Sequence, residues 1–267
     1  MRARSLPSPR LTRRALALLP LTLVACTALA LGCADINTDP QSVASMGIDT
    51  IPSPAVVTHD SLRDTLGVAR PLHATAYNPQ GDALTNVPIR FLAADSGAFV
   101  DSATGYVIGG NVRSTPVRII AEAGGLQTMA DTVWVVPAPD SIVAQNPSDT
   151  LAYSLSDSTL NVSSGFVVKV LHRNGTATPD PVRGWIVSYR IVAPADTLLA
   201  QLVGDNGRGA RVDTTASDGT ASRRIRVRPI RLGASTDSVI VEAMVRYRGV
   251  PISGAPLRFV LQVKPRS

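Results

Sequence analysis

The chain has 267 residues and carries 26 basic and 20 acidic side chains, for a formal net charge of +6. Five of the basic residues are arginines that precede Cys33, which leaves 21 basic against 20 acidic residues in the rest of the chain. This balance argues against nucleic-acid binding, which depends on a clear excess of positive charge. Both cysteines lie at or before position 33, so the remaining chain depends on packing and not on disulfides.

Residues 1–32 are expected to form a secretory signal peptide. Arginines cluster in the first 14 positions, the first acidic residue is Asp35, and an apolar run extends from Ala15 to Leu31. A cationic start followed by a short apolar stretch and small residues is typical of a cleaved export signal. The run is about as long as the shortest membrane-spanning helices, so a permanent anchor is the alternative. The small residues and cysteine at its end favour cleavage.

Two cysteines lie in segments that resemble the lipobox of bacterial lipoproteins, in which a cysteine after small residues becomes lipidated. The first segment ends at Cys26 and fits the family pattern better letter by letter, while the second ends at Cys33. Cleavage before Cys26 would leave an apolar segment exposed on the mature protein, which is unfavourable. We therefore expect lipidation at Cys33, with Cys26 as the alternative. The resemblance implies a lipid anchor in the membrane.

Beyond the signal, residues 33–47 are polar and without periodicity, and they are predicted to be a flexible tether. Later segments alternate apolar and polar side chains, which predicts strands with one face in a core. The clearest of these segments are residues 87–93, 185–191, 239–247 and 257–263. No stretch of helical periodicity is sustained after residue 40, so the sequence predicts an all-β protein.

Turn residues separate these segments at intervals typical of a sandwich or barrel, as at Asn78–Gly81 and Ser217–Gly219. Pro137 and Pro139 interrupt the chain between two strand-like stretches and cannot donate backbone hydrogen bonds to a sheet. We therefore predict two tandem immunoglobulin-like β-sandwiches, over residues 48–137 and 138–267. Each has about 100 residues, enough to bury a core.

The segment from Ala210 to Ala221, which contains Thr-Ala-Ser-Asp-Gly-Thr-Ala, resembles a signature of bacterial immunoglobulin-like domains of the invasin and intimin type (Big-1). Segments 87–91 and 101–105 resemble a more divergent form of the same family. The resemblance implies β-sandwich modules that act as spacers or binding modules in surface proteins. Unlike those adhesins, this chain would be held by its lipid.

No pattern for catalysis, cofactor binding or metal binding is found. His59, His73 and His172 are isolated, without a second histidine or cysteine at metal-ligand spacing. The glycine-rich segment from Gly204 to Gly209 lacks the lysine and hydroxyl residue of a phosphate-binding loop, and it is predicted to be a loop between strands. Asp205 within it could offer oxygen to Ca²⁺, but the other ligands are not evident. We expect no enzyme activity, no cofactor and no metal.

Two clusters of charged residues are candidates for surface roles. Asp60, Arg63 and their neighbours are expected to lie in a solvated edge or loop. Arg224, Arg226 and Arg228 share one face of a predicted strand and form a candidate binding surface for an acidic glycan, lipid head groups or a protein. The alternative, which we favour, is that these arginines protect an exposed strand from edge-to-edge pairing.

The sequence therefore predicts a non-enzymatic, lipid-anchored protein of the cell envelope, in the outer membrane and facing the periplasm or the cell surface. Its modules would serve adhesion, scaffolding or assembly, with an envelope protein or glycan as partner. The alternative is a carbohydrate-binding module or a non-catalytic subunit of a glycan-processing system.

Overall fold

The computed structural model describes residues 39–266, except 177, 196–197 and 230–237. Within this part of the chain the elements are strands and one short 3₁₀ helix, η1 (Ser158–Leu160), which confirms the all-β prediction. The strands up to residue 136 are β1 (Ser45–Thr50), β2 (Ala55–Val57), β3 (His73–Tyr77), β4 (Ala83–Leu84), β5 (Arg90–Ala93), β6 (Ala98–Val100), β7 (Val107–Gly109), β8 (Val117–Ala123), β9 (Leu126–Gln127) and β10 (Asp131–Val136).

The strands from residue 141 onward build a second module. They are β11 (Ser141–Ala144), β12 (Ser148–Tyr153), β13 (Phe166–His172), β14 (Asp180–Pro181), β15 (Ile186–Ala193), β16 (Ala200–Val203), β17 (Val212–Thr214), β18 (Thr220–Val227), β19 (Ser238–Met244), β20 (Arg246–Tyr247), β21 (Val250–Pro251) and β22 (Leu257–Pro265). Since β10 ends at Val136 and β11 begins at Ser141, the prolines at 137 and 139 lie in the connection between the modules.

The first module is a sandwich of two sheets. One sheet has the order β1-β3-β4 and the other β2-β10-β8-β5, with β9 beside β8 and a separate hairpin of β6 and β7. Alternate residues of these strands face inward, as in β8, where Val117, Ile119 and Ala121 are buried. They meet Phe91 from β5 in one apolar core.

The second module is larger and has the same two-layer plan. Its sheets have the orders β11-β13-β18-β16 and β12-β22-β19-β15-β17. Phe166 from the first sheet and Phe259 from the second pack with ring centroids 5.2 Å apart. The predicted inward faces are confirmed, because Trp185, Val187 and Tyr189 are buried. Phe259, Leu261 and Val263 of the last strand are buried as well.

The two modules share a way of closing their sheets, which is typical of an immunoglobulin-like sandwich. In each, the first strand joins one sheet in antiparallel pairing, as β1 with β3 and β11 with β13. The next strand then crosses to the other sheet and pairs in parallel with the module's last strand, as β2 with β10 and β12 with β22. The chain therefore contains the same architecture twice.

A turn is also repeated at the same place in both modules, directly before β7 and β18. Gly105 and Gly219 both have positive φ, at 74° and 78°, where glycine is favoured. Their carbonyls accept hydrogen bonds from the N–H groups of Leu72 and Val170, at 2.9 Å in each case. A Cβ on Gly219 would lie 2.7 Å from the carbonyl oxygen of Val170, so this turn requires glycine.

The first strand begins earlier than predicted. β1 starts at Ser45, so the last residues of the predicted tether, 45–47, belong to the first sheet. Met46 and Ile48 of β1 pack partly buried against the core of the first module. The alternation of Met46 and Ile48 is short, and the serine and glycine beside them made the segment look like a polar tether.

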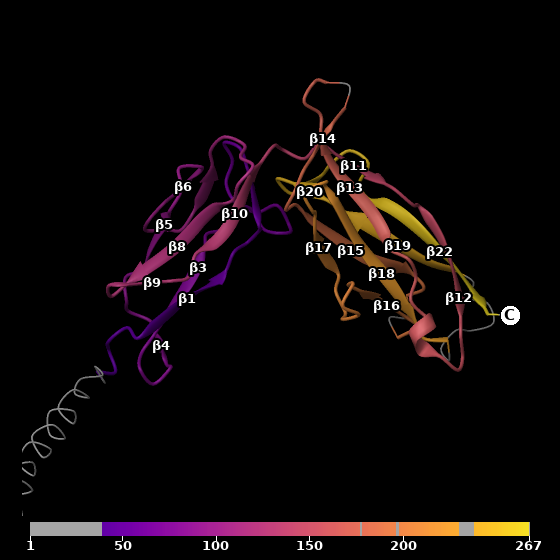
Figure 1. Ribbon diagram of the computed structural model, residues 1–267, viewed down its shortest axis with the longest axis horizontal. Helices are drawn as coiled ribbons and strands as arrows, with labels where there is room; N and C mark the ends of the chain where they lie inside the picture. Colours follow the sequence, from indigo (N-terminus) through magenta and orange to yellow (C-terminus); the bar gives the residue numbers. More distant parts are fainter. Residues whose placement is uncertain (1–38, 177, 196–197, 230–237, 267) are drawn as a thin grey trace, which may run out of the picture.

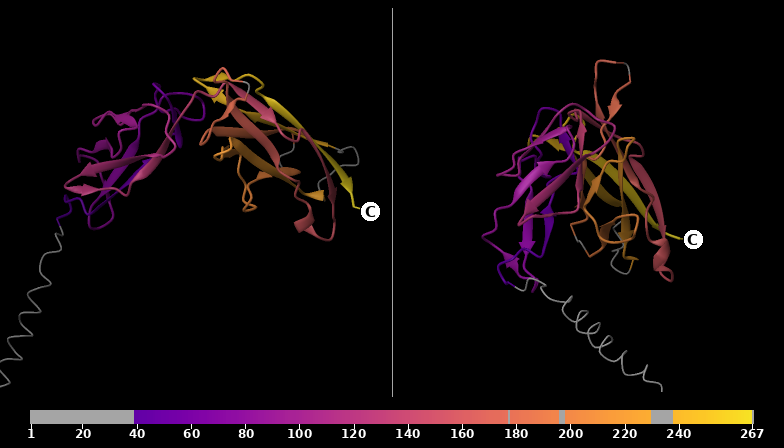
Figure 2. Two further views of the ribbon diagram at one scale, coloured as in Figure 1. Left: turned by 45° about the horizontal axis from the view of Figure 1, so that its top comes forward. Right: turned by 60° about the vertical axis from the view of Figure 1, so that its left-hand side comes forward.

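The modules form two lobes that touch where the chain passes from one to the other, and their opposite ends diverge (Figure 1, and the left view of Figure 2). The chain enters the first module at the end away from the junction (Figure 1). The C-terminus lies at the far end of the second module (Figure 1).

Candidate functional site

The junction between the modules is organised around a buried carboxylate, that of Asp60. Asp60 follows β2 in the first module, and its side chain is only 7% exposed. Burying an unpaired charge costs several kcal/mol, so such a carboxylate needs hydrogen-bond donors around it. These donors come from both modules, and Tyr247 of the second module is 187 residues from Asp60 in the sequence.

Within the first module, Asp60 accepts hydrogen bonds from the Ser61 N–H at 2.8 Å and from the Arg63 guanidinium at 2.8 and 3.1 Å. From the second module, the Tyr247 hydroxyl donates at 2.9 Å and the Arg248 Nε at 3.0 Å. One carboxylate thus holds donors from two folding units in one network. We call Asp60, Arg63, Tyr247 and Arg248 the junction cluster.

The charges of the junction cluster are complementary. Burial opposes ionisation of Asp60, but the hydrogen bonds from Arg63, Arg248, Ser61 and Tyr247 outweigh it and hold the pKa of Asp60 well below its ordinary value. For Tyr247, burial and the hydrogen bond to the Asp60 carboxylate both raise the pKa. The carboxylate is therefore ionised and the phenol protonated at neutral pH, which is the pairing that the hydrogen bonds need.

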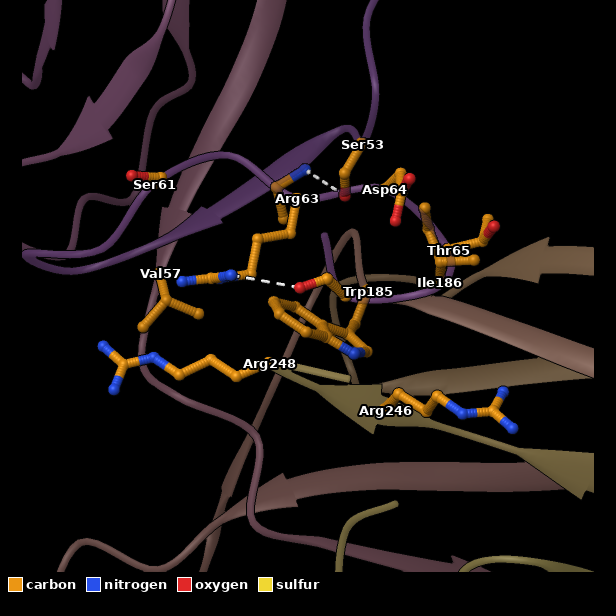
Figure 3. Close-up of a pocket in the computed structure, with 12 residues that line it drawn as sticks. Ser53, Val57, Ser61, Arg63, Asp64, Thr65, Trp185, Ile186, Arg246 and Arg248 are labelled. Atoms are coloured by element: carbon orange, nitrogen blue, oxygen red, sulfur yellow. Dashed lines mark hydrogen bonds between the residues drawn. The ribbon is translucent and has the colours of Figure 1, made fainter. Parts of the chain in front are cut away.

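Beside the cluster, the backbones of two turns are in close contact. Gly67 of the first module and Gly249 of the second have φ of 81° and 80°. A Cβ on Gly67 would lie 2.1 Å from the Gly249 nitrogen, so only glycine fits there. Arg63 also donates to the Gly67 carbonyl at 3.0 Å. Figure 3 shows Arg63, Trp185 and Arg248 around the cleft at this contact.

Apolar side chains complete the junction. Ala55, Val57 and Val136 of the first module belong to the same buried cluster as Trp185 of the second. The interface is thus continuous with the core of the second module. Its apolar surface is removed from water, which stabilises the contact as it does in a core. This continuity favours a fixed angle between modules, whereas a small polar interface would allow movement.

A stacked pair lies at the edge of this apolar contact. The Arg183 guanidinium lies 3.6 Å from the ring centroid of Trp134, which is a cation–π geometry. Trp134 is partly buried and packs against the core cluster of the second module. Gly184 follows Arg183, and a Cβ there would lie 3.2 Å from the Ala55 Cβ.

The junction is suited to holding two modules together. The Asp60 carboxylate accepts hydrogen bonds from Ser61 and Arg63 of one module and from Tyr247 and Arg248 of the other, so it links the two. Among the residues that the structure describes, no group of three or more His, Cys, Asp or Glu could hold a metal ion.

The prediction of a solvated loop for Asp60 and Arg63 is wrong. The local sequence mixes charges as exposed loops do, and the partners Tyr247 and Arg248 lie in another module. Only the tertiary structure brings them together. The prediction holds better for the neighbouring Asp64, whose ion pair with Arg70 at 3.3 Å is on the surface of the same loop.

Arg224 and Arg226 of β18, and Arg228 directly after it, alternate with buried residues as predicted, but the strand is not an edge. Arg224 and Arg228 are exposed and Arg226 is partly so, while Ile225 between them is buried. Because β18 pairs with β13 on one side and β16 on the other, protection against edge pairing cannot explain these charges. The preceding Arg223 points inward and forms an ion pair with Asp213 at 2.9 Å.

The remaining predicted features are dispersed. His59 and His73 are exposed, and the partly buried His172 is hydrogen-bonded to the Ala138 carbonyl at 2.8 Å. Gly204–Gly209 is a loop between β16 and β17, as predicted. The Oδ1 atom of Asp205 in this loop lies 3.7 Å from the Nε atom of Arg224.

The lipidation candidates Cys26 and Cys33 lie outside the described residues. Within the described ranges, no helix is long and apolar enough to cross a membrane.

Comparison with known proteins gives distant likenesses among solved structures. No protein-family model and no curated protein matches the sequence. Among solved structures, the adhesin InvE of Yersinia pseudotuberculosis is 12% identical over 79% of this chain, with a TM-score of 0.35. Domains 4 and 5 of the S-layer protein SbsC are 13% identical over 84% of this chain and 99% of their own length, with a TM-score of 0.28. This chain spans 56% of the InvE structure.

Proposed function

We propose that this protein is a non-enzymatic lipoprotein of the cell envelope that presents two immunoglobulin-like modules, of the Big-1 type, as a rigid scaffold for adhesion or assembly. The observation that carries the proposal is the junction cluster, in which Asp60 binds Tyr247 and Arg248 of the other module. A fixed angle between modules allows a protein to hold a binding surface at a set position. A protein whose modules serve as a flexible linker would not need such an angle.

The positions of the chain ends support this role. The first module is entered at the end away from the junction, and the second module ends away from it as well (Figure 1). A lipid on Cys33, or alternatively on Cys26, would hold the first module near the outer membrane. The second module would then be presented at a fixed angle, and its loops and sheet faces would be available to partners.

Lipid labelling tests the anchor. Cells grown with radiolabelled palmitate and expressing the parent, Cys33→Ala or Cys26→Ala chain are compared after immunoprecipitation. We expect label in the parent and in the Cys26→Ala variant and none in Cys33→Ala. Loss of label only in Cys26→Ala would move the anchor to that residue, and absence of label in all three would refute lipidation.

Protease treatment of intact cells tests the side of the membrane. Digestion of the second module in intact cells would place it at the surface and favour adhesion. Protection until the outer membrane is opened would place it in the periplasm and favour a scaffold for assembly. Recovery of the full chain in the soluble fraction with intact signal would contradict both.

One observation favours the second candidate, carbohydrate binding. Phe99 of β6 and Tyr106, directly before β7, are 64% and 40% exposed. Phe99 pairs with Ile108, and Tyr106 is two positions from Ile108, so alternation places both rings on the same face. Exposed aromatic rings can stack on sugars. A glycan array probed with the parent and with Phe99→Ala would show glycan binding that the variant loses, if this candidate is right.

A further inference from the structure

A cleft opens in the second module where its two sheets separate, between β15 and β16. It has a volume of about 650 Å³, which is in the range of small-molecule sites, and its described lining residues come from strands of both sheets. The chain from Gly209 to Arg211, which leads from β16 towards β17, forms another wall. The junction cluster lies elsewhere, so this cleft is not used by the proposed scaffold role.

The polar part of the cleft is cationic. Arg190, Arg211 and Arg228 line it together with Gln201, and none of the described lining residues is acidic. Arg190 is neutralised by Glu242, with Arg190 Nη2 and Glu242 Oε2 2.7 Å apart. Arg211 and Arg228 form no ion pair within the described residues. Arg211 and Arg228 thus line one opening, and neither has a carboxylate partner among the described residues, which favours binding of an oxyanion.

The rest of the lining is aliphatic. Ile191 of β15 and Ala200 and Leu202 of β16 lie at the inner side, and Leu198, which is 52% exposed, lies nearer solvent. None of the described residues that line the cleft is aromatic, so they offer no stacking surface for a sugar or base. An aliphatic wall next to two arginines matches a ligand that has an anionic head and an apolar chain.

We propose that this cleft binds aliphatic carboxylates, with the carboxylate between Arg211 and Arg228 and the chain against Ile191 and Leu198. A bare anion would leave the aliphatic wall uncovered, and a neutral alcohol would leave both guanidinium groups unmatched. Binding therefore requires both parts of the ligand. Arg228, identified from sequence as part of a basic strand face, acquires in this way a specific role.

The test uses the full chain, purified in a nonionic detergent, and three probes of similar simplicity: hexanoate, acetate and 1-hexanol. Binding is followed by the NMR amide shifts of residues in β16 and of Arg211 and Arg228. We expect hexanoate to bind at least ten-fold more tightly than acetate or 1-hexanol. Because charged hydrogen bonds are lost, Arg228→Gln and Arg211→Gln should each weaken hexanoate binding by about five- to ten-fold.

Two further variants separate the parts of the site. Leu198→Ser removes apolar contact at an exposed position that should not affect folding, and it should weaken hexanoate by about three-fold while leaving acetate unchanged. Arg90→Gln removes an exposed arginine of the first module and should change nothing. Equal affinity for hexanoate and 1-hexanol, or unchanged hexanoate affinity in both cleft arginine variants, would overturn the proposal. The scaffold role would be unaffected by that outcome.

Discussion

The junction cluster predicts that one carboxylate controls the angle between the modules. In Asp60→Asn the charge that Tyr247 and Arg248 contact is removed. A hydrogen bond to a charged group contributes about 1.5–3 kcal/mol, and the bond from the Tyr247 hydroxyl to the Asp60 carboxylate is of this kind. The Arg248 side chain is 58% exposed, so its pair contributes only about 0.2–1 kcal/mol. We therefore expect Asp60→Asn to weaken the contact between modules by about 2–4 kcal/mol.

Double electron–electron resonance between spin labels on Met129→Cys and Leu155→Cys measures the consequence. These positions are 93% and 83% exposed and lie in different modules, so labels there should not disturb packing. Cys26 and Cys33 are replaced by serine to avoid extra labels. The parent should give one narrow distance distribution, and Asp60→Asn a broad one.

Asp64→Asn is the matched control, because the hydrogen-bond donors to the Asp64 carboxylate, Leu66, Val68 and Arg70, belong to its own module. It should leave the distances unchanged. In a double-mutant cycle on the free energy of unfolding, Asp60→Asn and Tyr247→Phe should be coupled by about 1–2 kcal/mol. A distribution in Asp60→Asn as narrow as in the parent, together with additive free energies, would refute the clamp.

Three further predictions concern the same fold. Gly67→Ala should broaden the distance distribution, because its Cβ would lie 2.1 Å from the Gly249 nitrogen. Gly81→Ala, at a φ of 87° and with open space around it, should lower stability by about 1–2 kcal/mol from backbone strain alone and leave the distances unchanged. The contribution of the Asp60 carboxylate to the free energy of unfolding should be constant from pH 8 to 5. Thr215→Val should lower the free energy of unfolding by about 1–3 kcal/mol, because the buried hydroxyl donates to the Val182 carbonyl and accepts from the Trp185 N–H.

The pH dependence follows from the lowered pKa of Asp60. The carboxyl takes up a proton near pH 3.8 when unfolded but only at lower pH when folded, so its stabilisation is complete above 3.8. It is lost as the pH falls below about 4, which urea titrations at each pH would measure. Loss of junction stability already at pH 6 would contradict this assignment. Equal distance changes in Gly67→Ala and Gly81→Ala, or a neutral Thr215→Val, would contradict the other two predictions.

The sequence alone predicted much of the local structure of this protein. Strand faces such as those of Val187 and Tyr189 follow from a period of two, and turns such as that at Gly219 follow from residues that tolerate positive φ. Both patterns depend on neighbours within a few positions. Pro137, which interrupts two strand-like stretches of the sequence, lies between the end of β10 and the start of β11.

What the sequence did not decide depends on residues far apart in the chain. Asp60 looked like a surface charge until Tyr247 and Arg248 were placed against it. Strand order decided that β18 lies inside its sheet, where charge cannot serve to protect an edge. The cleft likewise exists only because the two sheets separate beside Arg211 and Arg228. Alternation along a strand fixes which side is buried, but pairing between strands and modules is set by the packing of the whole chain.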